Sequence, residues 1–106
     1  MVADDRGVVG FCRSGPAHDP DLGGQAAEVY GLYIEPDRIG TGLGRALLGH
    51  AVADLDKRGC RPVCVYAYTP NSGAIRFYQR AGLALDGASR LDQHDGIGVR
   101  EVRLVK

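Results

Sequence analysis

The sequence lacks the features that mark several classes of protein. No apolar run approaches the roughly 18 residues that a membrane-spanning helix needs, and the N-terminus has no basic-then-apolar secretion pattern. The three cysteines, Cys12, Cys60 and Cys64, form no Cys-x-x-Cys pair and, being odd in number, no plausible disulfide framework. We therefore expect neither a membrane protein nor a disulfide scaffold, but a protein of the reducing cytoplasm.

Charge of either sign is not in excess, because 13 basic residues balance 13 acidic ones. No basic stripe suggests nucleic acid as a partner, and His18, His50 and His94 share no spacing typical of a metal site, so no metal is expected. The distribution is nevertheless uneven: residues 1–40 carry seven acids and three bases, and residues 41–90 three acids and seven bases. The basic half suits an anionic ligand, although a solvated surface explains most of these charges equally well.

The pattern of apolar and turn residues predicts a single α/β domain over residues 1–106, with no internal repeat. We expect strands near residues 2–3, 8–12, 28–35, 61–68, 83–85 and 99–105, helices at 41–58 and 72–80, a tight turn at 4–7, and loops at 14–27 and 86–98. The strand, helix and strand between residues 28 and 68 form a crossover, which predicts that these two strands are parallel.

A glycine-rich segment, Pro36 to Leu48, joins the third strand to the first helix and reads PDRIGTGLGRALL. Glycines at 40, 42 and 44 let the backbone approach a ligand with no side chain between them. A helix start also presents unpaired N–H groups and a positive dipole end, which favour a phosphate or pyrophosphate. The segment is thus a candidate anion cradle; the alternative is an ordinary glycine-rich turn before a helix.

Two segments resemble motifs of the GCN5-related N-acetyltransferase (GNAT) family. Residues 39–44, IGTGLG, overlay the family's acyl-CoA motif, Gln/Arg-x-x-Gly-x-Gly/Ala, and residues 71–83, NSGAIRFYQRAGL, are similar to its Asn-x-x-Ala-x-x-Phe-Tyr segment. The resemblance implies an acyl-CoA N-acyltransferase fold, with a central mixed β-sheet flanked by two helices. It also implies acetyl-CoA as co-substrate and an amine-bearing acceptor.

The chain departs from the family pattern in two ways. Ile39 stands where Gln or Arg is usual, with Arg38 one place earlier. The strand and two helices that usually precede the first hairpin are not seen, so we expect a truncated or partial member, a fragment, or a protomer completed by another copy. A homodimer is the expected assembly.

The resemblance implies a set of residues that bind acetyl-CoA. The glycine loop would hold the pyrophosphate, the strand after Gly31 would pair with the pantetheine arm, and the second helix would contribute further contacts. The set is Leu32, Tyr33, Ile34, Ile39, Gly40, Thr41, Gly42, Leu43, Gly44, Arg45, Asn71, Ala74 and Tyr78. Arg45 is equally well explained as a surface residue, and Asn71 as a helix N-cap.

Gly31 predicts a β-bulge, because glycine weakens a strand and often marks one, although it is alternatively a glycine merely tolerated there. The resemblance implies that the exposed N–H near Leu32 or Tyr33 polarises the thioester carbonyl.

Two further residues have implied catalytic roles. Tyr78 matches the tyrosine that donates a proton to the leaving thiolate, and Glu28 matches a glutamate that accepts the proton of the amine. The alternatives are core packing for Tyr78 and an exposed strand end for Glu28. Cys64 is expected to be a buried structural thiol rather than a nucleophile.

The resulting hypothesis is an N-acetyltransferase in which the amine attacks acetyl-CoA directly in a ternary complex. The main alternative is a catalytically incomplete CoA-binding module or half of an intertwined dimer. A weaker one is a nucleotide-binding fragment that prefers ATP or NAD.

Overall fold

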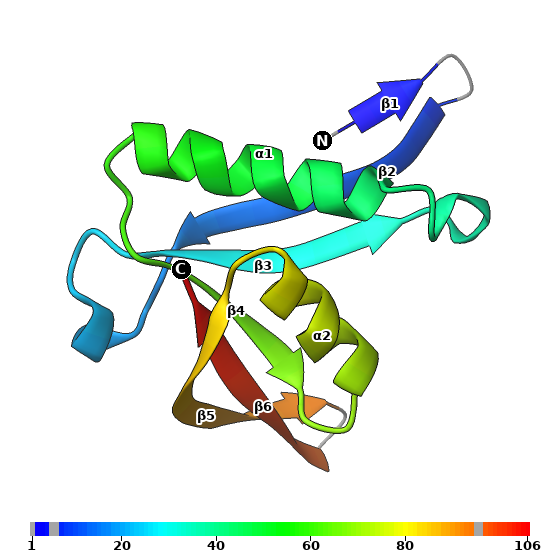
Figure 1. Cartoon of the computed structure of the whole chain (residues 1–106). Helices are drawn as coiled ribbons and strands as arrows, with labels where there is room; N and C mark the ends of the chain where they lie inside the picture. Colours follow the sequence, from blue (N-terminus) through cyan, green and yellow to red (C-terminus); the bar gives the residue numbers. More distant parts are fainter. Residues whose placement is uncertain (1, 5–6, 95–96) are drawn as a thin grey trace. The chain divides into compact units, whose positions relative to one another are not determined.

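The computed structural model describes residues 2–4, 7–94 and 97–106, and its contacts divide the chain into two compact units, one ending at Val63 and the other starting at Cys64. The first unit contains β1 (Val2–Asp4), β2 (Gly7–Pro16), η1 (Pro20–Leu22), β3 (Ala27–Ile34), η2 (Pro36–Arg38) and α1 (Leu43–Lys57). β4 (Val63–Tyr68) begins at the boundary, and the second unit adds α2 (Ser72–Arg80), β5 (Ala84–His94) and β6 (Ile97–Val105) (Figure 1). Among the described helices, none is long and apolar enough to cross a membrane.

In the first unit, helix α1 packs on a sheet formed by β1, β2 and β3. Both strand pairs are antiparallel, and α1 lies along β2 and β3 (Figure 1). Leu47, Leu48 and Leu55 form the buried stripe of the helix, as its apolar spacing predicts. The packing is close at Gly10 of β2, because a Cβ there would lie only 3.0 Å from a methyl carbon of Leu47.

Strand β2 is longer than the sequence predicted. We expected the strand to end at Cys12 and residues 14–27 to form a loop, but Ser14, Gly15 and Pro16 pair with β3. The turn-forming side chains of this stretch misled the prediction, since backbone pairing with β3 overrides local preference. Part of the predicted turn at residues 4–7 lies outside the described residues, namely positions 5 and 6.

The predicted β-bulge is confirmed, and Tyr30 is its extra residue. Arg13 pairs with Gly31 and Ser14 with Val29, so Tyr30 has no opposite residue on β2. The bulge changes the alternation of β3: Ala27 and Val29 share a face before it, and Leu32 and Ile34 continue that face after it. The hydroxyl of Tyr30 donates a hydrogen bond to the carbonyl of Pro16.

Both helices occur where the sequence predicted them. Helix α1 spans residues 43–57 against the expected 41–58, and Gly59 follows it with a φ of 78°. Helix α2 spans residues 72–80 as expected, with Asn71 as its N-cap and Gly82 after its end at a φ of 96°. Positive φ angles explain glycine at these two positions.

The second unit is built on the antiparallel strands β4, β6 and β5, with β6 between the other two. The predicted loop at 86–98 is largely wrong, because β5 continues to His94 and pairs with β6. The pairing is irregular between Leu85 and Ser89. The aspartate and glycine that suggested a loop lie in this stretch, where Gly87 has a φ of 89°. Residues 95 and 96 of that loop lie outside the described residues.

An ion pair with a buried arginine holds this irregularity. Arg103 of β6 is 5% exposed, and its Nε and Nη2 atoms lie 2.8 and 2.7 Å from Oδ2 of Asp86. The other carboxylate oxygen of Asp86 accepts a hydrogen bond from the Ala88 N–H at 3.0 Å. The Asp86 carboxylate therefore satisfies a buried cation and fixes the backbone of β5 at the same time.

Candidate functional site

The glycine loop between β3 and α1 has the geometry of an anion cradle. Gly40 and Gly42 have φ angles of 86° and 89°, and a Cβ at either would meet no atom within 4 Å, so the surface there is open. The first hydrogen bond into the helix runs from the Ala46 N–H to the Gly42 carbonyl. In the described bonds, the N–H groups of residues 43–45 have no backbone acceptor, so they are available to an anion at the helix start.

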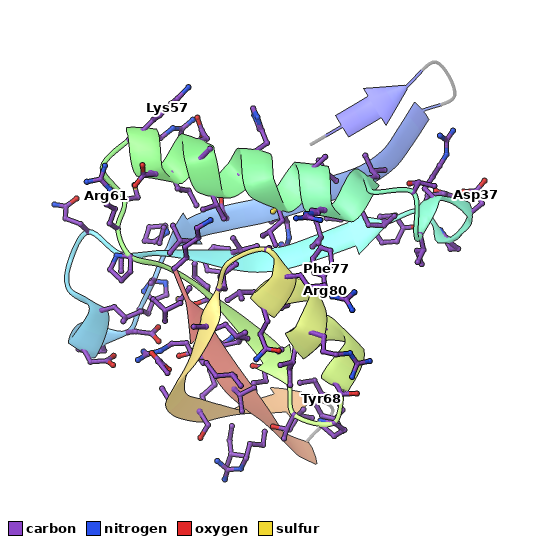
Figure 2. The ribbon with its side chains drawn as sticks, viewed as in Figure 1. Asp37, Lys57, Arg61, Tyr68, Phe77 and Arg80 are labelled. Atoms are coloured by element: carbon purple, nitrogen blue, oxygen red, sulfur yellow. The ribbon has the colours of Figure 1, made fainter. Side chains whose placement is uncertain are left out.

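Side chains around the loop are arranged differently from what the sequence suggested. Thr41 Oγ1 donates to the Arg38 carbonyl at 2.5 Å, and the Thr41 N–H approaches the same oxygen at 3.2 Å. The hydroxyl proton of Thr41 therefore holds the turn rather than facing a ligand. Arg45 is exposed, Ile39 is 70% exposed, and Asp37 lies at the outer turn of η2 (Figure 2).

The strand residues predicted to bind the pantetheine arm lie after the bulge. Leu32, Tyr33 and Ile34 pair with Cys12, Phe11 and Gly10 of β2. The Tyr33 ring is 43% exposed and stacks on Phe11 with 5.4 Å between centroids. The bulge therefore separates a buried first half of β3 from a second half with exposed aromatic surface.

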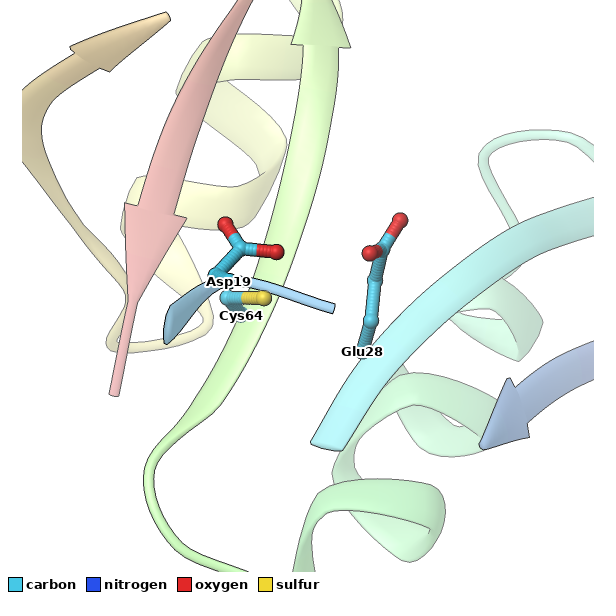
Figure 3. Close-up of side chains that lie close together, drawn as sticks. All are labelled: Asp19, Glu28 and Cys64. Atoms are coloured by element: carbon cyan, nitrogen blue, oxygen red, sulfur yellow. The ribbon is translucent and has the colours of Figure 1, made fainter. Parts of the chain in front are cut away.

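Glu28 lies in the buried half of β3, before the bulge. Its side chain is 4% exposed, so the alternative that it is an ordinary exposed strand-end residue is wrong. A carboxylate oxygen of Glu28 lies within 4.8 Å of one of Asp19, which the chain places in the segment before η1 (Figure 3). Burial and a nearby like charge both disfavour an ionised carboxylate, so this environment differs from that of an exposed acid.

The residues of the second motif lie on α2, in the second unit. The Asn71 side chain accepts a hydrogen bond from the Ala74 N–H at 3.0 Å, so its predicted capping role is confirmed. Tyr78 is half-buried one turn beyond Ala74, and its ring meets that of Phe77 edge-on at 5.4 Å (Phe77 is labelled in Figure 2). Spacing by four residues puts Ala74 and Tyr78 on one face of the helix.

Cys12 and Cys64 are poor nucleophiles. Cys64 is fully buried, as expected for a structural thiol. Cys12 is half-buried, and burial raises the pKa of its thiol, which keeps it in the neutral form at pH 7.

A pocket of about 560 Å³ lies in the first unit between β2 and α1. Its lining consists of Cys12, Ser14, Leu43, Ala46, Leu47, His50, Ala51 and Asp54. Only Leu43 belongs to the residues predicted from the sequence. Leu47 belongs to the predicted apolar stripe of α1, but no motif in the sequence links the lining residues of α1 to those of β2.

Comparison with known proteins settles the family. A family model described as "Acetyltransferase (GNAT) family" matches residues 1–83. The chain belongs to the GNAT family. Its fold is that of solved family members: a GNAT protein of Desulfovibrio desulfuricans superposes with a TM-score of 0.78 and 25% identity, over 98% of this chain and 64% of that one.

Other GNAT proteins agree on the fold. A ribosomal-protein-alanine N-acetyltransferase of Brucella melitensis gives a TM-score of 0.82 over 99% of this chain and 65% of its own length, at 21% identity. An acetyltransferase of Salmonella typhimurium, solved with its cofactor acetyl-CoA, gives 0.76 over 97% and 60%, at 21% identity. These comparisons confirm the acyl-CoA N-acyltransferase fold predicted from the sequence.

Among sequence relatives, a mycothiol acetyltransferase of Cellulomonas flavigena is 40% identical over 68 residues, which are 64% of this chain and 20% of that protein. An uncharacterized N-acetyltransferase of Methanocaldococcus jannaschii is 40% identical over 58 residues, 55% of this chain and 26% of its own. The chain thus spans a fifth to about a quarter of these curated relatives.

Sequence reasoning missed Asp19. It lies in a stretch rich in turn residues and precedes Glu28 by nine positions, so no motif or periodicity links the two. Knowing that β2 extends to Pro16 would have helped, because Pro16 pairs with Ala27. The connection that contains Asp19 therefore begins and ends next to Glu28.

Proposed function

We propose that this GNAT protein transfers the acetyl group of acetyl-CoA to a primary amine by direct attack in a ternary complex. The observation that carries the proposal is the glycine loop, whose N–H groups at residues 43–45 open the α1 helix beside two glycines with positive φ. A pyrophosphate has the charge and the acceptor oxygens that such a group of donors recognises.

The remaining cofactor contacts follow from the family motifs. Backbone groups of residues 32–34 pair with the pantetheine amides as an added strand would. Arg45 adds positive charge at the helix start, and Asn71, Ala74 and Tyr78 of α2 contact the cofactor. Ile39 contributes through its backbone, since its side chain carries no donor.

The chemical step needs a neutral amine, a base and an acid. The amine nitrogen attacks the thioester carbon, so a C–N bond forms and the C–S bond breaks. The proton of the resulting ammonium passes to the Glu28 carboxylate, and the departing thiolate takes the phenolic proton of Tyr78. The exposed N–H near Leu32 or Tyr33 stabilises the negative charge that develops on the carbonyl oxygen. The products are an N-acetylated amine and CoA.

Thermal unfolding with acetyl-CoA, CoA, ATP or NAD tests the cofactor. Ligand at 100 times Kd stabilises a protein by about 2.7 kcal/mol, a rise in Tm on the order of 10 °C for a domain of this size. We expect this rise with acetyl-CoA and CoA only. Equal or larger rises with ATP or NAD would favour a nucleotide-binding fragment instead.

Two glycine variants locate the binding site. Gly42→Ala forces a side chain into a left-handed conformation and displaces the N–H groups that follow, so we expect at least tenfold weaker acetyl-CoA binding by calorimetry. Gly49→Ala is the matched control, because Gly49 lies within α1 and a Cβ there also meets no atom within 4 Å. Equal affinities in the two variants would contradict the cradle.

The acceptor is sought with a panel of amines. The names of relatives supply members of the panel: mycothiol acetyltransferase, ribosomal-protein-alanine N-acetyltransferase and nourseothricin acetyltransferase act on chemically different acceptors. CoA release that depends on one amine would support the transferase. Tight acetyl-CoA binding without turnover on any amine would support the CoA-binding module.

A further inference from the structure

The two carboxyl groups of Asp19 and Glu28 come from segments that the fold brings together within the first unit. Glu28 follows Ala27 at the start of β3, opposite Gly15 of β2, and Asp19 lies just before η1 in the connection between these strands. Their carboxylate oxygens lie within 4.8 Å of each other (Figure 3). Asp19 is half-buried and Glu28 is 4% exposed, so water screens the pair poorly.

We propose that Asp19 is a positioning residue for the acetyl-transfer reaction, and that its negative charge makes Glu28 a stronger proton acceptor at neutral pH. The inference rests on the proposed function, in which Glu28 takes the proton of the amine. It adds a residue from outside both family motifs to the machinery of this chain.

The physical basis is the repulsion between like charges in a poorly solvated place. A buried carboxylate beside a second carboxylate is protonated more easily, because binding a proton removes both the repulsion and the cost of burying a charge. Other titratable or charged groups on the adjoining segments, Arg13 of β2, His18 beside Asp19 and Asp21 of η1, have exposed side chains and are screened by water. Asp19 is therefore the poorly screened charge that this unit places beside Glu28.

The test is a direct titration of Glu28 by NMR, in protein labelled with ¹³C at glutamate side-chain carboxyls. The Glu28 signal is assigned as the one missing from Glu28→Gln. We expect its titration midpoint to fall by roughly one to two pH units in Asp19→Asn, which removes the charge with little change in shape. Asp21→Asn is the matched control and removes an exposed charge two positions away; the Glu28 midpoint should stay within about 0.2 units.

The pH profile of acetyl transfer provides the second readout. For any accepted amine, the acidic limb of kcat/KM should move to lower pH in Asp19→Asn by the same amount as the NMR midpoint, and Asp19→Glu should restore it. An unchanged NMR midpoint overturns the proposal, and so does a shifted midpoint with an unmoved acidic limb. An unchanged NMR midpoint leaves the proposed function as it stands. A shifted midpoint with an unmoved limb also removes Glu28 as the proton acceptor, but it leaves acetyl transfer from acetyl-CoA, which fails separately if acetyl-CoA does not bind.

Discussion

Tyr78 illustrates how a single residue can serve packing and chemistry at once. Its ring packs edge-on against Phe77, while its hydroxyl is the proposed proton donor to the CoA thiolate. Tyr78→Phe keeps the ring, so acetyl-CoA affinity should be unchanged, whereas kcat should fall about 10- to 100-fold. Steady-state kinetics with an accepted amine measures this, and an unchanged kcat would remove Tyr78 from the mechanism.

Asn71 poses the same question, because it caps α2 and matches a CoA-contacting asparagine. Asn71→Ala should lower the free energy of unfolding by about 1 kcal/mol through loss of the bond to the Ala74 N–H. Asn71→Asp keeps the cap, so its stability should equal that of the unchanged chain, but its added negative charge should weaken binding of an anionic cofactor. Equal acetyl-CoA affinity in Asn71→Asp would leave Asn71 with the capping role alone.

Asp86 should contribute more to stability than an acid whose partner is exposed, because its partner Arg103 is buried. Removing its charge in Asp86→Asn weakens the ion pair to the Arg103 guanidinium, whose side chain is only 6% exposed, and we expect a loss of about 3 kcal/mol in urea unfolding. Asp56→Asn is the control, since Asp56 pairs with Arg61 where the side chains are 59% and 66% exposed, and its effect on stability should be much smaller. Similar losses in both variants would contradict the special role of the pair with the buried arginine.

The sequence correctly predicted those residues whose roles depend on their immediate neighbours in the chain. The loop glycines, the Asn71 cap and the buried Cys64 each follow from a short segment and its intrinsic preferences. Asp19, Arg103 and Asp86 gain their importance from partners 9 to 17 positions away. Their pairing depends on strand register, which a single sequence does not encode in any local signal.

At the level of elements, the contact between β2 and α1 depends on the absence of a side chain at Gly10. A Cβ there would lie 2.9 Å from the Tyr33 carbonyl and 3.0 Å from Leu47 Cδ1. Gly10→Ala should therefore lower the free energy of unfolding by about 1–3 kcal/mol, because the strand and the helix must move apart.

Gly24→Ala provides the comparison for this variant. Gly24 is exposed in the connection before β3, and a Cβ there meets no atom within 4 Å, so its substitution should change stability by no more than about 0.5 kcal/mol. Unfolding curves for the two variants, recorded side by side, measure the difference. A Gly10→Ala protein as stable as Gly24→Ala would show that the helix does not pack on β2 so closely.

Helices were easier to predict than strands for a physical reason. The apolar stripe of α1, and the N-cap and terminal glycine of α2, are all set by residues only a few positions apart in the chain. The ends of β2 and β5 instead depend on pairing with another strand, which incorporates residues such as Ser14 and Gly87 despite their preference for turns. Turn residues within a paired strand therefore led to both errors.

At the scale of the whole molecule, the edge of β2 bears on whether two chains associate. Within the described residues, β1 pairs with only the first part of β2, so the outer edge of β2 beyond Gly10 has no strand beside it. An open edge of this kind favours pairing with another chain. We expect light scattering after size exclusion to give twice the subunit mass of 11.3 kDa. A monodisperse monomer at all concentrations would count against the homodimer.

The bulge at Tyr30 has a consequence for how this protein tolerates natural change in length. Because the bulge already takes up one extra residue, a variant that lacks Tyr30 would form a regular ladder with Val29 and Leu32 still on one face. A variant with one more residue in β3 would turn one half of the strand over, exposing Val29 or burying the Tyr33 side. Loss of one residue should therefore be tolerated at the bulge and gain of one should be eliminated, which makes the upper limit of the strand's length a selected trait.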